Sequence, residues 1–244
     1  MVNNPVDIFI HICTVNCWQY VVLDQFKRLL RSGLFDKARS INCVLAGSDS
    51  LPWYVPYNVI ERVDPKRYEW PTLCNIKKFA EKNPDSLILY LHTKGVTNKG
   101  YLEKSVPDFR FKCKQDWRKM MEYFLIERYD LALSILEKAD TCGVCLRGGN
   151  LKRHGKAAWR FRKPLYYGNF WWARASHILK LPITKELLID RLAAERWIGM
   201  GDDSIMAEMW ESKMNHDSTY CPRSAYVNKQ IIKFYKLNGT LRQI

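Results

Sequence analysis

The sequence predicts a single α/β domain in which a mixed β-sheet is flanked by helices. Short apolar runs, typical of buried strands, alternate with segments whose apolar residues recur at helical spacing. The chain of 244 residues is long enough for one large domain and contains no Ser/Gly linker, internal repeat or low-complexity block. Its composition, 47% hydrophobic and 26% charged, excludes a chain that is disordered throughout.

The first hundred residues have the pattern of β-α-β units. The last apolar run in this part is hydrophobic at consecutive positions, as in a parallel sheet that is covered on both faces. Ser32-Gly33 and Asn83-Pro84 are stop signals for the helices before them. In chain order we expect a strand at Asp7–Cys13, a helix over 18–33, a strand at Ile41–Ala46, a helix at Pro71–Glu81 and a strand at Ser86–Leu91.

The second half continues the alternation of helices and strands. Helical spacing extends over residues 117–136, as one helix or as two that are broken near Tyr129-Asp130. The other expected elements are a strand at Thr141–Leu146, an aromatic strand or strand-turn at Leu165–Ala173, a helix at Thr184–Ile198 and a basic, irregular tail.

The charge of the chain points to an anionic partner. Lys and Arg number 39 against 25 Asp and Glu, a net charge of +14. Most of the excess lies in two segments, Lys94–Lys119 and Arg147–Lys163, and each follows a predicted strand. In open α/β sheets, the loops after the carboxyl ends of strands form the ligand crevice. A solvated surface explains the same clusters about equally well.

The eight cysteines predict reduced thiols in a cytoplasmic protein. Most lie in apolar runs, and the chain begins with no secretory signal peptide. Cys142 and Cys145 lack a second Cys/His pair at zinc spacing, so burial is the preferred interpretation of that pair. The longest stretch without a charged residue, Ile8–Leu23, contains His11 and Asn16, and we therefore expect no membrane span.

Two motifs carry candidate binding chemistry. His92, Thr93 and Lys94 end the strand before Gly95, and a lysine in that position can neutralise a diphosphate, although a strand-end histidine and a turn lysine explain the motif too. In Tyr166–Arg174, a Gly-Asn turn offers an amide for sugar hydroxyls, and neighbouring indoles offer flat faces for sugar rings. One of the two indoles is expected in the core, because alternate strand residues face opposite sides.

Glu195 is a carboxylate on a largely apolar predicted helix. Such a group is costly unless it is paired, here with Arg191 or Arg196, or used as a base. From this local sequence alone, a structural ion pair ranks slightly ahead of a catalytic role.

Taken in order, several motifs resemble a group of glycosyltransferase-like proteins found in bacterial polysaccharide clusters and in large algal viruses (chloroviruses). The resemblance covers roughly residues 6–200, and its most specific parts are Gly-Asn-Phe-Trp-Trp-Ala and Glu-x-Trp-Ile-Gly. The other motifs that carry it are Tyr-Leu-His-Thr-Lys-Gly95, Asp116-Trp-Arg-Lys-Met-Met-Glu-Tyr-Phe124, Cys-Gly-Val and Leu-Pro182.

The resemblance implies a GT-A fold in one domain over 1–244. A Rossmann-like nucleotide-binding half is expected at about 1–100, an acceptor-side half at about 101–210 and the basic tail at 211–244. It implies transfer of a sugar from a UDP- or GDP-linked donor to a hydroxyl of a glycan or glycoprotein acceptor.

The resemblance also assigns site residues. The donor loop maps to His92, Thr93 and Lys94, and the late acid to Glu195, our candidate general base if the reaction inverts the anomeric centre, with Asp190 as the second candidate. The nucleotide is expected over the strand ends, near Thr14, Val15, Asn16 and Asp49, with Asp64 near its base or ribose. The sugar-facing turn maps to Gly168 and Asn169, with Trp171 beside them.

One departure from the family leaves metal use open. Many GT-A enzymes carry Asp-X-Asp where this chain has His92-Thr93-Lys94, and those acids hold Mn²⁺ or Mg²⁺ on the diphosphate. The remaining candidate ligands are His92 and the acidic pair Asp202 and Asp203, which an exposed helix start before Ile205 explains equally well.

Two alternatives belong to other classes. The net charge and 13% aromatic residues fit a non-catalytic nucleic-acid-binding protein, but no known RNA- or DNA-binding motif is present, so nucleic acid is not the expected partner. A carbohydrate-binding relic of the same fold without turnover is the other alternative.

Overall fold

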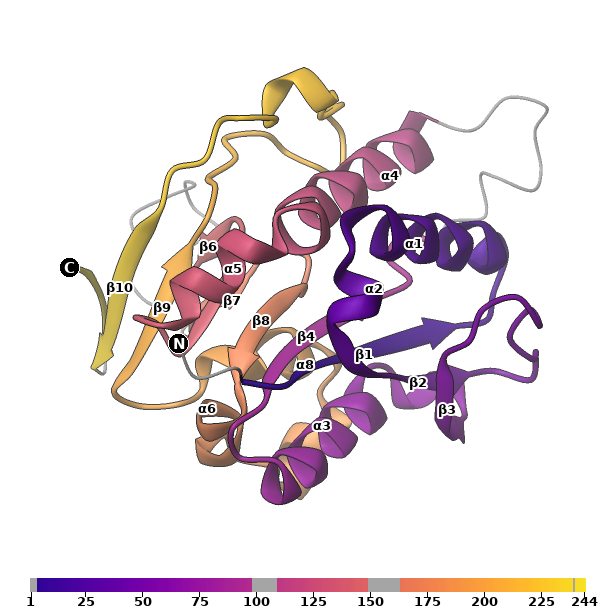
Figure 1. The fold of residues 1–244 in the computed structure, drawn as a ribbon, viewed down its shortest axis with the longest axis horizontal. Helices are drawn as coiled ribbons and strands as arrows, with labels where there is room; N and C mark the ends of the chain where they lie inside the picture. Colours follow the sequence, from indigo (N-terminus) through magenta and orange to yellow (C-terminus); the bar gives the residue numbers. More distant parts are fainter. Residues whose placement is uncertain (1–3, 98–108, 149–162, 239) are drawn as a thin grey trace.

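The computed structural model describes residues 4–97, 109–148, 163–238 and 240–244. Its centre is a mixed sheet with the strand order β11-β10-β9-β5-β8-β4-β1-β2-β3, and helices cover both faces (Figure 1). The prediction of a mixed α/β sheet flanked by helices is therefore confirmed. The strands of this sheet are β1 (Val6–Cys13), β2 (Ala38–Ala46), β3 (Asn58–Val63), β4 (Leu87–His92), β5 (Thr141–Gly143), β8 (Trp171–Arg174), β9 (Ser204–Glu208), β10 (Lys233–Asn238) and β11 (Thr240–Gln243).

The first half of the chain supplies the parallel part of the sheet. Strand β1 pairs in parallel with β2 and β4, and β2 pairs in parallel with β3. The carboxyl ends of β1, β2 and β4, at Cys13, Ala46 and His92, consequently lie at one edge of the sheet. In that position, open α/β sheets form their ligand sites.

The second half extends the same sheet with antiparallel strands. Strand β8 runs antiparallel to both β4 and β5, and β9 runs antiparallel to β10. The C-terminal segment was expected to be an irregular tail, which is wrong for residues 233–243 because β10 and β11 pair there. Tyr235 and Leu237 alternate with exposed lysine and asparagine, the pattern of a strand buried on one face.

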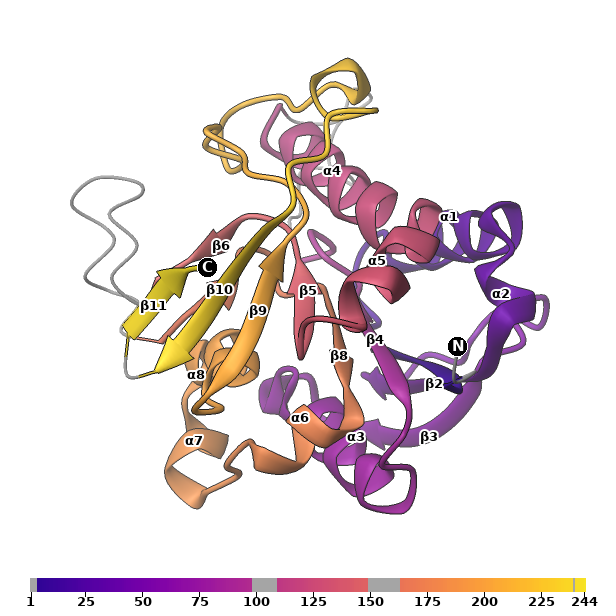
Figure 2. The ribbon, with the colours of Figure 1, turned by 60° about the vertical axis from the view of Figure 1, so that its left-hand side comes forward.

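The helices form a layer on each face of the sheet. Helices α1, α4 and α5 cover one face, and α3, α6 and α8 cover the other (Figures 1 and 2). Gly33 ends α1 in the left-handed conformation, φ 79°, as the stop signal predicts. The bounds are α1 (Trp18–Ser32), α2 (Leu34–Lys37), α3 (Trp70–Lys82), α4 (Phe109–Glu122), the π-helix η3 (Tyr123–Glu127), α5 (Tyr129–Leu136), α6 (Ala175–Lys180), α7 (Lys185–Ile189) and α8 (Arg191–Arg196).

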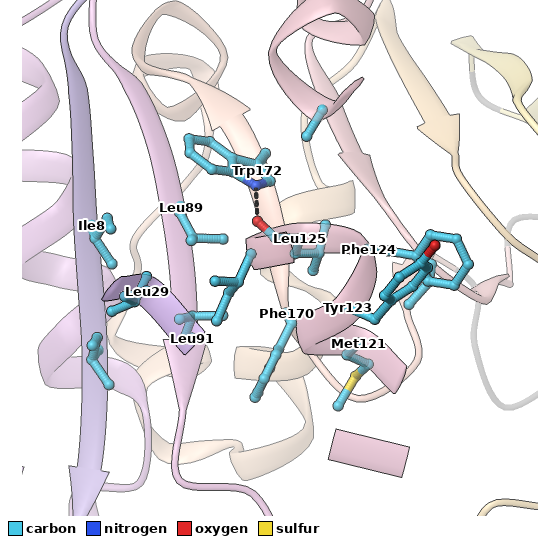
Figure 3. Close-up of a cluster of buried hydrophobic side chains, with 14 of the residues drawn as sticks. Ile8, Leu29, Leu89, Leu91, Met121, Tyr123, Phe124, Leu125, Phe170 and Trp172 are labelled. Atoms are coloured by element: carbon cyan, nitrogen blue, oxygen red, sulfur yellow. Dashed lines mark hydrogen bonds between the residues drawn. The ribbon is translucent and has the colours of Figure 1, made fainter. Parts of the chain in front are cut away.

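Two hydrophobic cores lie on opposite faces of the sheet because successive strand residues alternate between them. Leu89 packs in the core that includes α1 and α4, whereas Tyr90 packs in the core that includes α3 and α8. Both tryptophans of β8 are fully buried, one in each core, so neither is exposed. Figure 3 shows the first core, where the Trp172 indole donates to the Leu125 carbonyl, 2.9 Å away, in the π-helix.

Three element predictions need correction. The expected strand Thr141–Leu146 is β5 followed by β6 (Leu146–Arg147), which pairs with β7 (Leu165–Tyr166), because the chain turns at Cys145 with φ 55°. The expected helix Thr184–Ile198 is broken at Asp190, which caps α8 by accepting from the Leu192 amide. Asp202 and Asp203 precede strand β9 and not a helix.

The cysteine predictions agree with the structure. None of the eight cysteines, all of which lie in the described residues, forms a disulfide, and Cys142 and Cys145 are both buried, where desolvation raises the pKa of the Cys145 thiol to about 12. In the segments that the structure describes, no helix is at once long and apolar enough to cross a membrane.

Arg118 belongs to a basic segment of the sequence, but its charge is internal. The side chain is fully buried and donates to Glu122 at 2.6 and 2.8 Å and to Asp24 at 2.8 Å. Arg28 joins the same cluster, 3.1 Å from Glu122. Arg118 therefore holds α4 to α1 and does not contribute to a surface that attracts anions.

Candidate functional site

A cavity of about 400 Å³ opens at the carboxyl ends of β1 and β4. The loop before α3 and the helix α8 supply its other walls, through Glu69 and Glu195. Its ionisable lining comes from segments far apart in the sequence, and its members are His11, Cys13, Tyr68, Glu69, His92, Lys94, Lys114, Arg191 and Glu195. This cavity lies where the charge pattern and strand order predict a ligand site.

Two hydrogen bonds fix the loops that follow β1 and β4. The Cys13 amide donates to Oγ1 of Thr93, 2.9 Å away, and the Asn16 side chain donates to the Val96 carbonyl, 2.6 Å away. Asn16 has φ 51°, a conformation that asparagine tolerates better than most residues. One wall of the cavity is thus built from two loops that are tied to each other.

Lys94 and Lys114 bring positive charge to this wall. The ammonium nitrogen of Lys94 lies 4.0 Å from the ring centroid of Trp117, and that of Lys114 lies 5.1 Å from the same centroid. Lys114 also pairs with Asp217. Burial, with a contribution from Lys114, lowers the pKa of Lys94 to about 8, so this group is a cation at neutral pH and loses its charge in mild alkali.

Glu69 lies immediately before α3 and lines the cavity. Its Oε2 accepts a hydrogen bond from the Tyr90 hydroxyl, 2.8 Å away, and another from the Asn169 amide. Burial alone would raise the pKa of Glu69, but His92, His11 and the Tyr90 hydrogen bond outweigh burial and lower it. The side chain is therefore a carboxylate at neutral pH.

Two histidines lie side by side at the ends of β1 and β4. His11 is opposite His92 in the register of the two strands, and its Nδ1 lies 2.9 Å from Oγ1 of Thr72. Burial lowers the pKa of His11 to about 4 and also lowers that of His92. Nε2 of His92 carries a hydrogen, because it donates to the Gly168 carbonyl 2.9 Å away. Both rings are neutral at pH 7.

Glu195 faces the cavity, and none of the salt bridges among the described residues includes its carboxylate, although the charges of Lys94 and Arg191 act on it. Of its expected partners, Arg196 pairs with Asp190 at 2.8 Å, and Arg191 lies over the Tyr68 ring at the same cavity. Burial and the nearby Glu69 carboxylate raise the pKa of Glu195. A carboxylate with a raised pKa is suited to accept a proton near neutral pH.

The structure brings five of the predicted site residues to the cavity and leaves others outside its lining. Val15, His92, Thr93, Lys94 and Glu195 line it. The remaining predicted donor residues and the second candidate base form internal bonds: Thr14 to the Ala46 carbonyl, Asp49 to the Trp18 indole, Asp64 to the Lys66 amide, Asn16 to Val96, and Asp190 to Arg196 and the Leu192 amide.

The predicted sugar-facing turn does not agree with the burial of its side chains. Asn169 is 2% exposed and Trp171 is 0% exposed, and the amide oxygen of Asn169 accepts from the Trp171 indole at 3.1 Å. Gly168 has φ 106°, and a Cβ there would lie 2.4 Å from the sulfur of Met121, so the turn requires glycine. The turn positions His92 through the Gly168 carbonyl and Glu69 through the Asn169 amide. Its buried indole offers no exposed face on which a sugar could stack.

The candidate metal ligands are not gathered at one place. Nε2 of His92 donates its hydrogen to the Gly168 carbonyl and is therefore not available as a metal ligand. Asp202 and Asp203 are exposed, are absent from the cavity lining, and Asp202 lies 3.7 Å from Lys163. In residues 4–97, 109–148 and 163–238, no three His, Cys, Asp or Glu side chains form a group able to hold a metal ion.

Sequence reasoning missed Glu69, His11 and Lys114. His11 could have been found from the sequence, because a histidine inside the apolar run of β1 indicates a polar site at that strand. Lys114 is one lysine among many, and nothing local marks Glu69. Much of both basic segments, at 98–108 and 149–162, lies outside the described residues.

Comparison of the sequence with models of known protein families finds no match, and comparison with curated proteins finds no relative.

Proposed function

We propose that the chain is a glycosyltransferase of GT-A type, which moves a sugar from a UDP- or GDP-linked donor to a hydroxyl of a glycan or glycoprotein. The observation that carries this proposal is the presence of both Lys94 and Glu195 in one cavity at the carboxyl ends of parallel strands. An ammonium group suits a diphosphate, and a carboxylate that forms no salt bridge with the described residues suits deprotonation of an acceptor hydroxyl. The antiparallel strands that extend the parallel ones in the same sheet also fit the proposed fold.

In this mechanism each cavity residue has a separate task. Lys94, supported by Lys114, holds the diphosphate and stabilises the charge that develops on it as the sugar leaves. Glu195 accepts the proton of the acceptor hydroxyl as its oxygen attacks the anomeric carbon, and the bond from that carbon to the diphosphate breaks. His92 and His11, both neutral, leave the negative charge of the donor to the lysines.

Lys94 supplies a direct test of donor binding through its pH dependence. If only the charged lysine binds a diphosphate, its pKa of about 8 implies that affinity for UDP or GDP falls about tenfold between about pH 7 and about pH 9. Lys94→Arg should abolish this loss, because arginine stays charged. Calorimetric titration of the folded proteins measures both quantities.

Lys94→Ala is the matched control at the same position. It should weaken nucleotide binding roughly ten- to hundredfold with little change in melting temperature, because the ammonium group contributes little to the core. Unchanged affinity in this variant would remove Lys94 from the donor site. Stabilisation of the wild-type chain by nucleic acid but not by UDP or GDP would favour the nucleic-acid-binding alternative.

Metal removal is a second test. Among the described residues, the side chains around His92 do not fit a divalent ion, so we expect transfer to keep most of its rate in excess EDTA. The measurement is donor turnover with and without chelator, across UDP-, GDP-, dTDP- and CMP-sugars. Complete loss of turnover, restored by Mn²⁺, would contradict the assignment of the diphosphate to the lysines.

A further inference from the structure

The Glu69 carboxylate is held in a fixed orientation. Its two hydrogen bonds with described side chains both fall on Oε2, from Tyr90 and from Asn169. Tyr90 is fully buried, and the Asn169 amide cannot rotate to present its oxygen to Glu69 without losing the bond from the Trp171 indole. These neighbours therefore fix the orientation of the Glu69 carboxylate before any ligand enters.

Because both of these bonds fall on Oε2, Oε1 is the oxygen that is available to a ligand in the cavity. Glu69 lines the cavity, and its side chain makes no capping bond to α3, which follows it. A carboxylate oxygen only accepts hydrogen bonds, so the ligand group that satisfies it must be a donor such as a hydroxyl. Glu195 is a second carboxylate in the same cavity.

We propose that Oε1 of Glu69 accepts a hydrogen bond from a hydroxyl of the transferred sugar, and that the site selects neutral sugars over sugars that carry a carboxylate. This inference rests on the proposed function. A sugar that is joined to a diphosphate held by Lys94 lies within a few bonds of that lysine, and Lys94 and Glu69 lie close enough to influence each other's charge. A uronic acid in this place would meet two like charges.

Glu69→Gln tests the inference because it changes an acceptor into a donor. Tyr90 and Asn169 both donate, so they select the amide oxygen of glutamine and turn its NH₂ group to the cavity. The variant should bind the neutral donors UDP-glucose and GDP-mannose roughly ten- to hundredfold more weakly, and should lose much less affinity for UDP and GDP, which carry no sugar. Its affinity for UDP-glucuronate relative to UDP-glucose should rise.

Calorimetric titration of these five ligands distinguishes the outcomes. Glu186→Gln, on the exposed side of α7, is the control and should bind all five as wild type does. Equal loss for nucleotide and nucleotide sugar, or none for either, overturns the inference while the proposed function stands. Absence of nucleotide binding in the wild-type chain overturns both.

The wild-type chain decides the matter if Glu69→Gln does not fold. Donors that lack one hydroxyl each should then be compared with the parent donor. Loss of affinity for a single deoxy analogue, together with preference for UDP-glucose over UDP-glucuronate, supports the inference. Equal affinity for every analogue, or preference for the uronic acid, overturns it.

Discussion

Replacing Glu195 by Gln is expected to lower the rate of sugar transfer by about two to four powers of ten while donor affinity persists. The substitution keeps the shape of the side chain but removes its ability to accept the acceptor proton. Because Glu195 takes part in none of the salt bridges among the described residues, the substitution breaks none of them, and the melting temperature should change little. Turnover, donor affinity and melting temperature are to be measured on one preparation.

The pH profile gives this prediction a second readout. Because its pKa is raised, Glu195 takes up a proton at a higher pH than an ordinary glutamate does, and it then no longer acts as a base. The acidic limb of kcat/KM should therefore lie above that range in wild type and be absent from the residual activity of Glu195→Gln. A stable variant with normal turnover would refute the catalytic role of Glu195. Asp190 would then be the remaining candidate base, and it would first have to break its hydrogen bond with Arg196.

Replacing Arg118 by Met is expected to lower the free energy of unfolding by about 3–5 kcal/mol. The change leaves Glu122 buried with Arg28 as its remaining cationic partner among the described residues, and it removes the contact with Asp24. Chemical denaturation measures the loss. The combined Arg118→Met and Glu122→Leu protein should recover part of it, because the buried carboxylate is removed as well.

Arg67→Met is the control for this second prediction. Arg67 is exposed and lies 3.7 Å from the half-buried Glu61, so the change should alter stability by less than about 1 kcal/mol. An Arg118→Met protein as stable as this control would show that the buried cluster does not hold α1 and α4 together.

Local patterns predict β1, β2 and β4 well, since the buried parts of these strands are mainly apolar, and α1 ends at Gly33 as expected. They fail where pairing is long-range or a single turn decides the path. After β5 the chain changes direction at Cys145, which has a positive φ. Strand β10 forms because it pairs with β9, which is far from it in the sequence.

The site divides in the same way. Lys94 and Glu195 come from motifs and resemblance, and both line the cavity. Glu69 follows from no local signal, because only the packing of the loop before α3 against Tyr90 and Asn169 brings it there. Counting charges also misleads, since Arg118 adds to a basic segment but is neutralised inside the protein.

The ties between the loops after β1 and β4 affect how tightly a ligand is held. Ordering a loose loop around a ligand uses up conformational entropy, and this loss is subtracted from the affinity. Here the Asn16 and Thr93 bonds have already ordered both loops as far as Val96 during folding. A ligand on this wall enters a preorganised surface, so a small set of contacts is enough to retain it.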